Sequence, residues 1–174
     1  TRLPNGGLPD GAQMPGGFNM NARLLPDPRL TPGDVLDVTA ADIAVPGYAG
    51  KVRNVSTSLK KKIYASYGIT SRLPGEYTID HLISLQLGGS NSTRNLWPLS
   101  YQTQPWNAYI KIALENQLHD EVVEGRIPLA QAQRMIATDW IAAYKKIFKT
   151  QLPLKKHMRT STGHRLYNDN GELR

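Results

Sequence analysis

The segment 76–98 constrains the fold of this chain more than any other part of the sequence. It begins with an alternating apolar pattern that predicts a strand bending near its end, with the apolar members Tyr77, Ile79, Leu82, Leu85 and Leu87. Gly88-Gly89 and the Ser, Asn and Thr residues after them predict a loop, because glycine adopts positive φ without strain and Asn and Ser bond to their own backbone. Leu96-Trp97 then predicts a short return strand that stops at Pro98, which has no amide hydrogen for the ladder. The segment therefore predicts a β-hairpin.

Two polar residues, Asp80 and His81, interrupt the apolar strand side by side. Neighbours on a strand point to opposite faces, so the two side chains are not expected to be buried together on one core face. A carboxylate is a hard oxygen ligand for a divalent cation, and a neutral imidazole is a base that titrates near physiological pH. Taken alone, the pair is more simply explained as an Asp-His hydrogen bond at a strand end.

A helix is expected to follow the hairpin, over 106–125. Asn107, Lys111 and Glu115 are four residues apart, so they lie along one stripe of this helix. A parallel apolar stripe contains Ile110, Leu114 and Leu118. If the hairpin packs on this helix, a carboxylate, a carboxamide oxygen and an imidazole come together at one point.

The combination of motifs resembles the HNH, or ββα-metal, nucleases. The matching residues are Asp80-His81-Leu-Ile-x-Leu-x-Leu-Gly-Gly, then Asn95-Leu-Trp-Pro, then Asn107 at the head of a helix. More narrowly, the chain is similar to a bacterial HNH-nuclease-like family with an Asp-His-Leu-Ile-Pro-Leu-x-Leu-Gly-Gly core and a Trp-Ile-Ala-Ala-Tyr helix downstream. The resemblance covers residues 46–149. It implies an α+β fold in which a mainly helical domain surrounds a ββα-metal hairpin-plus-helix core.

The resemblance also implies a role for each matching residue. In that superfamily the first residue of the pair binds the metal, which falls on Asp80, and the second is the general base, which falls on His81. Asn95 matches the Asn that tethers the loop between the strands, and we group it with His81 as catalytic. Asn107 matches the remaining metal ligand. Glu115 matches a position that holds a metal-bound water in DRGH-type sites.

One divalent cation is the cofactor that the resemblance implies, with Mg²⁺ expected first and Mn²⁺ as the alternative. Sites built from one Asp and one Asn resemble those of homing endonucleases and DRGH-type enzymes that use magnesium. Lys111 occupies the position where colicin-type nucleases carry a second metal-binding His, and a charged lysine is no ligand, so Zn²⁺ is disfavoured. Ser84 stands where the family has Pro. The sequence has no cysteine for a structural zinc site.

The net charge of +7 and pI near 9.7 favour a polyanionic partner. We expect double-stranded DNA with RNA left open, and low sequence specificity, because no base-reading element is evident. The candidate phosphate contacts are Arg94, Lys111, Lys60 and Lys61. A solvated helix face explains Lys60 and Lys61 equally well, and the neighbouring motif favours phosphate. His119 is expected behind the metal ligands or at the surface rather than on the metal.

The chain divides into three segments by composition. Residues 1–33 form an irregular Pro/Gly-rich arm, 34–150 the nuclease-like domain, and 151–174 a basic tail or hairpin that turns at 168–171. Within the domain we expect a strand and a short helix over 34–45, a helix over 56–67 and a long helix over 129–150. No stretch approaches the eighteen apolar residues of a membrane span. The sequence lacks an initiator Met and a signal-peptide pattern, so we expect a processed chain, and the resemblance favours a secreted or cell-envelope location.

These features predict a metal-dependent endonuclease that hydrolyses phosphodiester bonds of DNA to 5′ phosphates and 3′ hydroxyls. Two alternatives stay open. The first is a non-catalytic nucleic-acid-binding or toxin-like module on an HNH scaffold, which would bind DNA without a cation and without cleavage. The second is a structural protein of an envelope or virion assembly, which would form a defined oligomer without affinity for nucleic acid.

Overall fold

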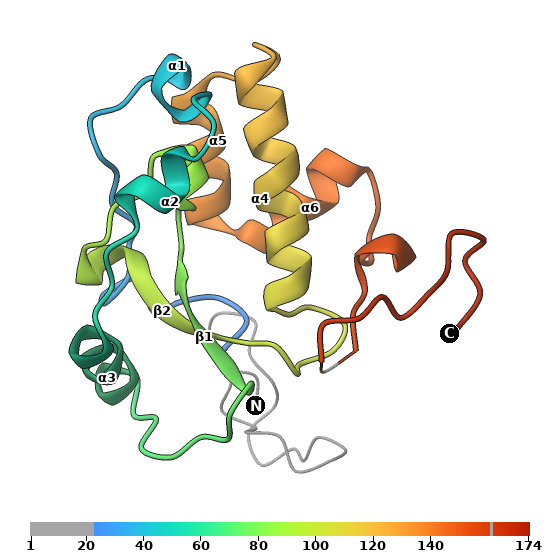
Figure 1. Cartoon of the computed structure of the whole chain (residues 1–174), viewed down its shortest axis with the longest axis horizontal. Coiled ribbons are helices and arrows are strands. Elements are labelled where there is room, and N and C mark those ends of the chain that lie inside the picture. The colour runs from blue at the N-terminus through green and yellow to red at the C-terminus, as the bar shows by residue number, and fades with distance from the viewer. Residues whose placement is uncertain (1–22, 161) are drawn as a thin grey trace.

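The computed structural model describes residues 23–160 and 162–174, which combine helices with one two-stranded antiparallel sheet, in agreement with the expected α+β class. The α-helices are α1 (Ala40–Ile43), α2 (Tyr48–Val52), α3 (Thr57–Ser66), α4 (Ala108–Val123), α5 (Leu129–Thr138) and α6 (Trp140–Phe148). The strands are β1 (Tyr77–His81) and β2 (Leu96–Ser100), and the 3-10 turns are η1 (Leu85–Leu87), η2 (Thr93–Asn95) and η3 (Lys155–His157). Figure 1 shows the hairpin on one side of α4, α5 and α6 gathered around that helix, and the C-terminal segment running away from it.

β1 and β2 form the predicted hairpin, with Asp80 directly opposite Trp97. Two details of the prediction are wrong. β1 ends at His81, and the apolar residues after it include the turn η1 rather than more strand. β2 continues through Pro98, which pairs with Ile79. Each strand of a two-stranded sheet has one edge without a partner, so a proline whose nitrogen points to that edge leaves no ladder bond unmade.

The hairpin loop is held closed by one buried side chain, that of Asn95. Its Oδ1 accepts the Ile83 amide hydrogen at 2.9 Å, and its Nδ2 donates to the carbonyl oxygens of Ile83 at 3.0 Å and Ser90 at 2.9 Å. The loop passes so close to itself that a Cβ added at Gly89 would lie 1.7 Å from the Ile83 carbonyl oxygen. The tether predicted for Asn95 is therefore confirmed, and Gly89 is required for the approach.

Helix α4 lies at the centre of the core. Its predicted apolar stripe is fully buried, with Ile110, Leu114 and Leu118 each 0% exposed. Trp106, just before the helix, packs edge-on against Trp140 of α6, with ring centroids 6.1 Å apart. The turn η1 of the hairpin loop contacts α4 directly. These contacts place the strand end that carries Asp80-His81 beside the helix, as the sequence predicted.

The prediction of a single helix over 129–150 is wrong, because this segment forms two helices, α5 and α6, separated at Asp139. This residue has an extended backbone (φ −163°, ψ 98°), and its carboxylate accepts the Ala142 amide hydrogen at 2.9 Å. Asp is a strong N-cap residue, so it starts a new helix in place of continuing the old one. The break lets Trp140 turn into the core, where it is 0% exposed.

The segments before the hairpin partly follow the prediction. The helix expected over 56–67 is α3, capped by Ser56, and the short helix expected near 39–42 is α1, capped by Thr39. The strand expected in 34–45 is reduced to a single bridge between Val35 and Gly89. Helix α2 was not predicted. Its last residue, Val52, lies close to the end of β1, since Asn91 forms hydrogen bonds with both the Val52 carbonyl oxygen and the His81 ring.

The two ends of the chain differ in how far they are described. Most of the predicted arm, residues 1–22, lies outside the described residues. In the tail, Tyr167 and Leu173 form an antiparallel bridge around a turn in which the Gly171 amide donates to the Asn168 carbonyl oxygen at 3.0 Å. No helix within the described ranges has the length and apolar character needed to cross a membrane.

Candidate functional site

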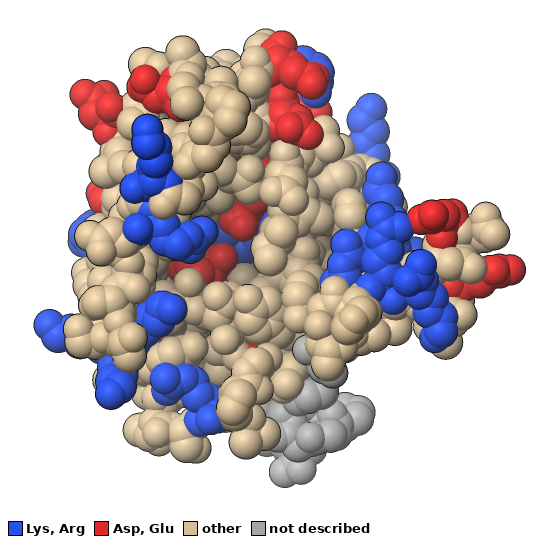
Figure 2. All heavy atoms as spheres, in the orientation of Figure 1, with Lys and Arg blue, Asp and Glu red and all other residues tan. Residues whose placement is uncertain are grey.

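A pocket of about 230 Å³ opens where β1, η1 and α4 meet, and we call it the His81 pocket. The residues that line it include Arg53, Asp80, His81, Ser84 and Glu115. Figure 2 shows a hollow on this face of the molecule with acidic side chains inside it and Lys and Arg side chains around it. Asp80 and His81 both line the pocket although they are strand neighbours, since the strand ends at His81 and the chain turns toward η1.

The His81 ring is held in one orientation by Asn91 of the hairpin loop. Its Nε2 lies 3.0 Å from Asn91 Oδ1. The amide of Asn91 is oriented by two other bonds, because Oδ1 accepts the Asn54 amide hydrogen at 3.2 Å and Nδ2 donates to the Val52 carbonyl oxygen at 2.7 Å. An amide oxygen only accepts, so Nε2 carries the ring hydrogen and the neutral ring has its lone pair on Nδ1.

His81 is also kept in its uncharged form. The side chain is largely buried, at 6% exposed. This burial lowers the pKa of His81 below its ordinary value, and the hydrogen bond to Asn91 and the charge of Asp80 oppose the change only in part. A neutral imidazole whose Nδ1 has no hydrogen-bond partner among the described residues is equipped to accept a proton.

One oxygen of Asp80, Oδ2, makes both a hydrogen bond and an ion pair. Trp97, which faces it across the hairpin, donates its indole N–H to Oδ2 at 2.9 Å. The Lys111 ammonium of α4 lies 2.9 Å from that same Oδ2. The Asp80 side chain is 11% exposed, so both contacts form in a largely dry environment. The Asp80 side chain is therefore held in a set orientation.

The Lys111 side chain is completely buried among oxygens. Besides Asp80, its Nζ lies 3.0 Å from the His81 carbonyl oxygen and 3.4 Å from Glu115 Oε2. Burial alone would lower the pKa of Lys111, but the charges of Asp80 and Glu115 outweigh it and the pKa is raised. Lys111 is 0% exposed and does not line the pocket, so the prediction that it contacts phosphate is wrong. The carboxylates of Asp80 and Glu115 hold the ammonium inside the protein instead.

Glu115 is the second carboxylate of the His81 pocket, and its side chain is 10% exposed. Burial raises its pKa to about 7, while the charge of Lys111 and a hydrogen bond from Ser84 act in the opposite direction. The predicted position of Glu115 on the stripe that faces Asp80 is confirmed by their shared contact with Lys111. Its predicted role beside a metal-bound water stays a prediction.

Asn107 has a different role from the predicted one. It is the N-cap of α4, where its Oδ1 accepts the Ile110 amide hydrogen at 3.2 Å and its Nδ2 donates to the Thr103 carbonyl oxygen at 3.1 Å. It is 2% exposed and is not among the residues that line the His81 pocket. The carboxamide oxygen that the resemblance assigns to the metal therefore caps α4 instead.

The side chains of the pocket do not fit the magnesium site that the resemblance implies. That site needs an oxygen from Asp80 and one from Asn107, and the second is used elsewhere. The carboxylate facing Asp80 is that of Glu115, and a buried ammonium already lies between the two. Over the described part of the chain, no group of three or more His, Cys, Asp or Glu side chains is placed to hold a metal ion.

The remaining predicted residues lie away from the pocket. His119 Nε2 lies 3.0 Å from the Ile43 carbonyl oxygen, so this ring contacts the end of α1. Arg94 is exposed in η2, and Lys60 and Lys61 are exposed on α3. None of these four lines the His81 pocket. The three basic side chains remain available to a polyanion at the surface.

Two contributors to the site were not predicted, namely Asn91 and the indole of Trp97. Trp97 was recognisable in principle, because a hairpin places it opposite Asp80. Asn91 lies in a loop of Ser, Asn and Thr residues, where nothing in the sequence distinguishes the one that reaches a histidine.

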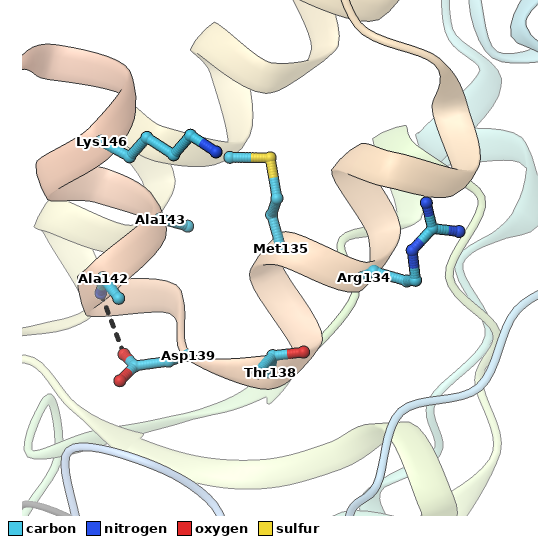
Figure 3. A pocket seen from close by; sticks show the side chains of 7 residues that line it. All are labelled: Arg134, Met135, Thr138, Asp139, Ala142, Ala143 and Lys146. Carbon is cyan, nitrogen blue, oxygen red and sulfur yellow. Dashed lines mark hydrogen bonds between the residues drawn. The ribbon is translucent and has the colours of Figure 1, made fainter.

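A second cavity, of about 330 Å³, lies in the angle between α5 and α6 (Figure 3). Its acidic residue, Asp139, is the N-cap of α6, as the dashed bond to Ala142 shows. Met135 and the alanines of α6 make most of its surface apolar. This cavity offers no group that would add to the chemistry of the His81 pocket.

Comparisons with protein-family models, with curated proteins and with solved structures find no match for this chain.

Proposed function

We propose that this protein is an endonuclease that hydrolyses phosphodiester bonds of nucleic acid, with the hairpin and α4 acting as an HNH-type core. The observation that carries the proposal is the state of His81. Its ring is held through Nε2 by Asn91 and is kept neutral by burial, and its Nδ1, in a pocket that Arg53 also lines, has no partner within residues 23–160 and 162–174. A histidine that serves only packing has no need of this arrangement.

The reaction that fits the pocket is attack of water on phosphorus. Nδ1 of His81 removes a proton from the water, whose oxygen forms a bond to phosphorus. The bond between phosphorus and the 3′ oxygen breaks, and that oxygen takes up a proton. The products are a 5′ phosphate and a 3′ hydroxyl. Arg53, at the edge of the pocket, supplies a positive charge to bind the phosphate.

The charge of the surface supports nucleic acid as the substrate. The chain carries a net charge of +7, and Figure 2 shows Lys and Arg side chains on more than one side of the hollow. Exposed residues at Arg94, Lys60 and Lys61 add positive charge on the hairpin loop and α3. Contacts of this kind bind the phosphate backbone without reading bases, so we propose DNA cleavage with low sequence specificity.

A plasmid-nicking assay tests the proposal. Purified protein is incubated with supercoiled DNA in EDTA and separately with Mg²⁺, Mn²⁺ or Zn²⁺, beside His81→Ala and the surface control His164→Ala. His81→Ala should slow nicking by about 10²–10⁴-fold, the usual contribution of a general base, while His164→Ala should cut like the parent. Equal rates for His81→Ala and the parent would exclude His81 as the base.

One observation favours the non-catalytic alternative, a nucleic-acid-binding module. The metal ligands that the resemblance calls for are not assembled, because Asn107 caps α4. A protein of this kind would bind DNA with a strong dependence on salt and would leave the plasmid intact under every condition.

A further inference from the structure

The positive charge inside the His81 pocket belongs to the protein itself. The Lys111 ammonium has three hydrogens, and three oxygens lie around it: Asp80 Oδ2 at 2.9 Å, the His81 carbonyl oxygen at 3.0 Å and Glu115 Oε2 at 3.4 Å. The side chain is 0% exposed, so water does not compete for these contacts. The ammonium is therefore a fixed cation bound by oxygen ligands at the end of the strand that carries the proposed base.

The Lys111 ammonium reduces the negative charge that Asp80 and Glu115 bring to the pocket. Two carboxylates beside a phosphodiester would repel it, and hydrolytic sites usually overcome this repulsion with a bound metal ion. Here the buried Lys111 ammonium offsets one of the two negative charges, and Arg53, which lines the pocket, offsets the other. The pocket therefore accepts a phosphate without an added ion.

A divalent cation on the same oxygens would meet strong repulsion. Asp80 Oδ2 already forms an ion pair with Lys111 and accepts a hydrogen bond from Trp97. An ion bound to this carboxylate would lie within a few ångströms of the ammonium, in an environment where water screens little. Binding would require Lys111 to lose its proton or to leave its three oxygens.

We propose that the Lys111 ammonium takes the place of a bound divalent cation in this pocket, so that nucleic acid is cut without one. The second half of this statement rests on the proposed function, whereas the first concerns cation binding alone. Because Lys111 is buried behind the pocket, it is a positioning residue: it holds the Asp80 carboxylate and the His81 backbone and balances their charge.

The cation-binding half is tested by titrating the full chain with Mn²⁺ and measuring free Mn²⁺ by electron paramagnetic resonance. The parent should bind no Mn²⁺ at millimolar concentration. Lys111→Met removes the ammonium at similar length, so its Mn²⁺ affinity should rise by about tenfold or more. Adding Asp80→Asn to Lys111→Met should abolish this gain, and the exposed control Lys146→Met, on α6 and outside the His81 pocket, should behave like the parent. If Lys111→Met does not fold, as judged by circular dichroism, the parent titration decides.

The cleavage half uses the nicking assay in EDTA. Nicking by the parent in EDTA that disappears in His81→Ala supports the inference. Nicking only with Mg²⁺ or Mn²⁺ overturns the inference and leaves the proposed function standing. Absence of nicking in every condition removes the proposed function, and the Mn²⁺ titration then judges the cation alone. One Mn²⁺ bound by the parent and lost in Asp80→Asn overturns the inference in that case too.

Discussion

Glu115→Gln should make the protein more stable above pH 7, although it changes a residue of the proposed site. Glu115 is buried, and its pKa is raised from 4.5 to about 7 chiefly by that burial. Each unit by which the pKa of a group differs between the folded and unfolded states changes the free energy of unfolding by ~1.4 kcal/mol. Ionising Glu115 in the folded protein therefore costs about 1–3 kcal/mol relative to the unfolded chain, where the lower bound allows for its strong interaction with Lys111.

The sign of the effect follows from proton binding. Between pH 4.5 and 7 the folded state holds a proton on Glu115 that the unfolded chain has lost, so stability falls as pH rises through this window. Glutamine has the shape of protonated glutamate and does not titrate. The variant should therefore match the parent near pH 4.5 and exceed its free energy of unfolding by about 1–3 kcal/mol at pH 8.

Urea denaturation at several pH values between 4.5 and 8.5 measures this difference. Glu121→Gln is the matched control, because the pKa of Glu121 is lowered by its hydrogen bonds to Arg126 and Gln117. That control should be neutral or slightly destabilising at pH 8, the opposite direction from Glu115→Gln. A Glu115→Gln variant that is less stable than the parent at pH 8 would mean that the ionised carboxylate is needed to satisfy Lys111, and would refute the reasoning.

Two further variants test the hairpin loop. Gly89→Ala should prevent or severely weaken folding, because its Cβ would lie 1.7 Å from a backbone carbonyl oxygen. Thermal melting measures this effect, with Gly50→Ala as the control, where an added Cβ meets nothing within 4 Å. A Gly89→Ala melting temperature equal to that of the parent would contradict the close approach. Asn91→Asp should raise the pKa of His81, since a carboxylate at that position favours the imidazolium. Nitrogen-15 NMR of the ring would follow the titration, and the low-pH limb of nicking should move to higher pH with it. An unchanged titration would show that Asn91 does not hold the His81 ring in solution.

The hairpin and the central helix were predictable because their signals are local. Alternating apolar residues, two adjacent glycines and a cluster of loop-forming residues define β1, the loop and β2, and a four-residue repeat defines α4. The sequence also indicated that Lys111 and Glu115 share the face that meets Asp80, because four residues advance a helix by about one turn. The sequence thus indicated which of these residues lie near Asp80, but not what each of them does there.

The roles depended on contacts that no local pattern contains. Asn107, Lys111 and Glu115 lie on the same stripe, but the point along α4 at which the hairpin packs decides which of them meets Asp80. In the structure Lys111 and Glu115 meet Asp80, while Asn107 accepts the free Ile110 amide hydrogen of the first turn. A one-turn difference in packing separates a carboxamide ligand from a buried ammonium.

By itself, the sequence determined a basic chain with a β-hairpin carrying Asp80-His81, a loop closed by Asn95, and an apolar helix to support them. Only the tertiary structure decided that His81 is held by Asn91, that Lys111 is an internal cation and that Asp139 divides the last long helix. The physical reason is that burial and charge pairing are properties of surfaces brought together from distant segments. Periodicity fixes which face of an element a residue occupies, and packing alone fixes what that face meets.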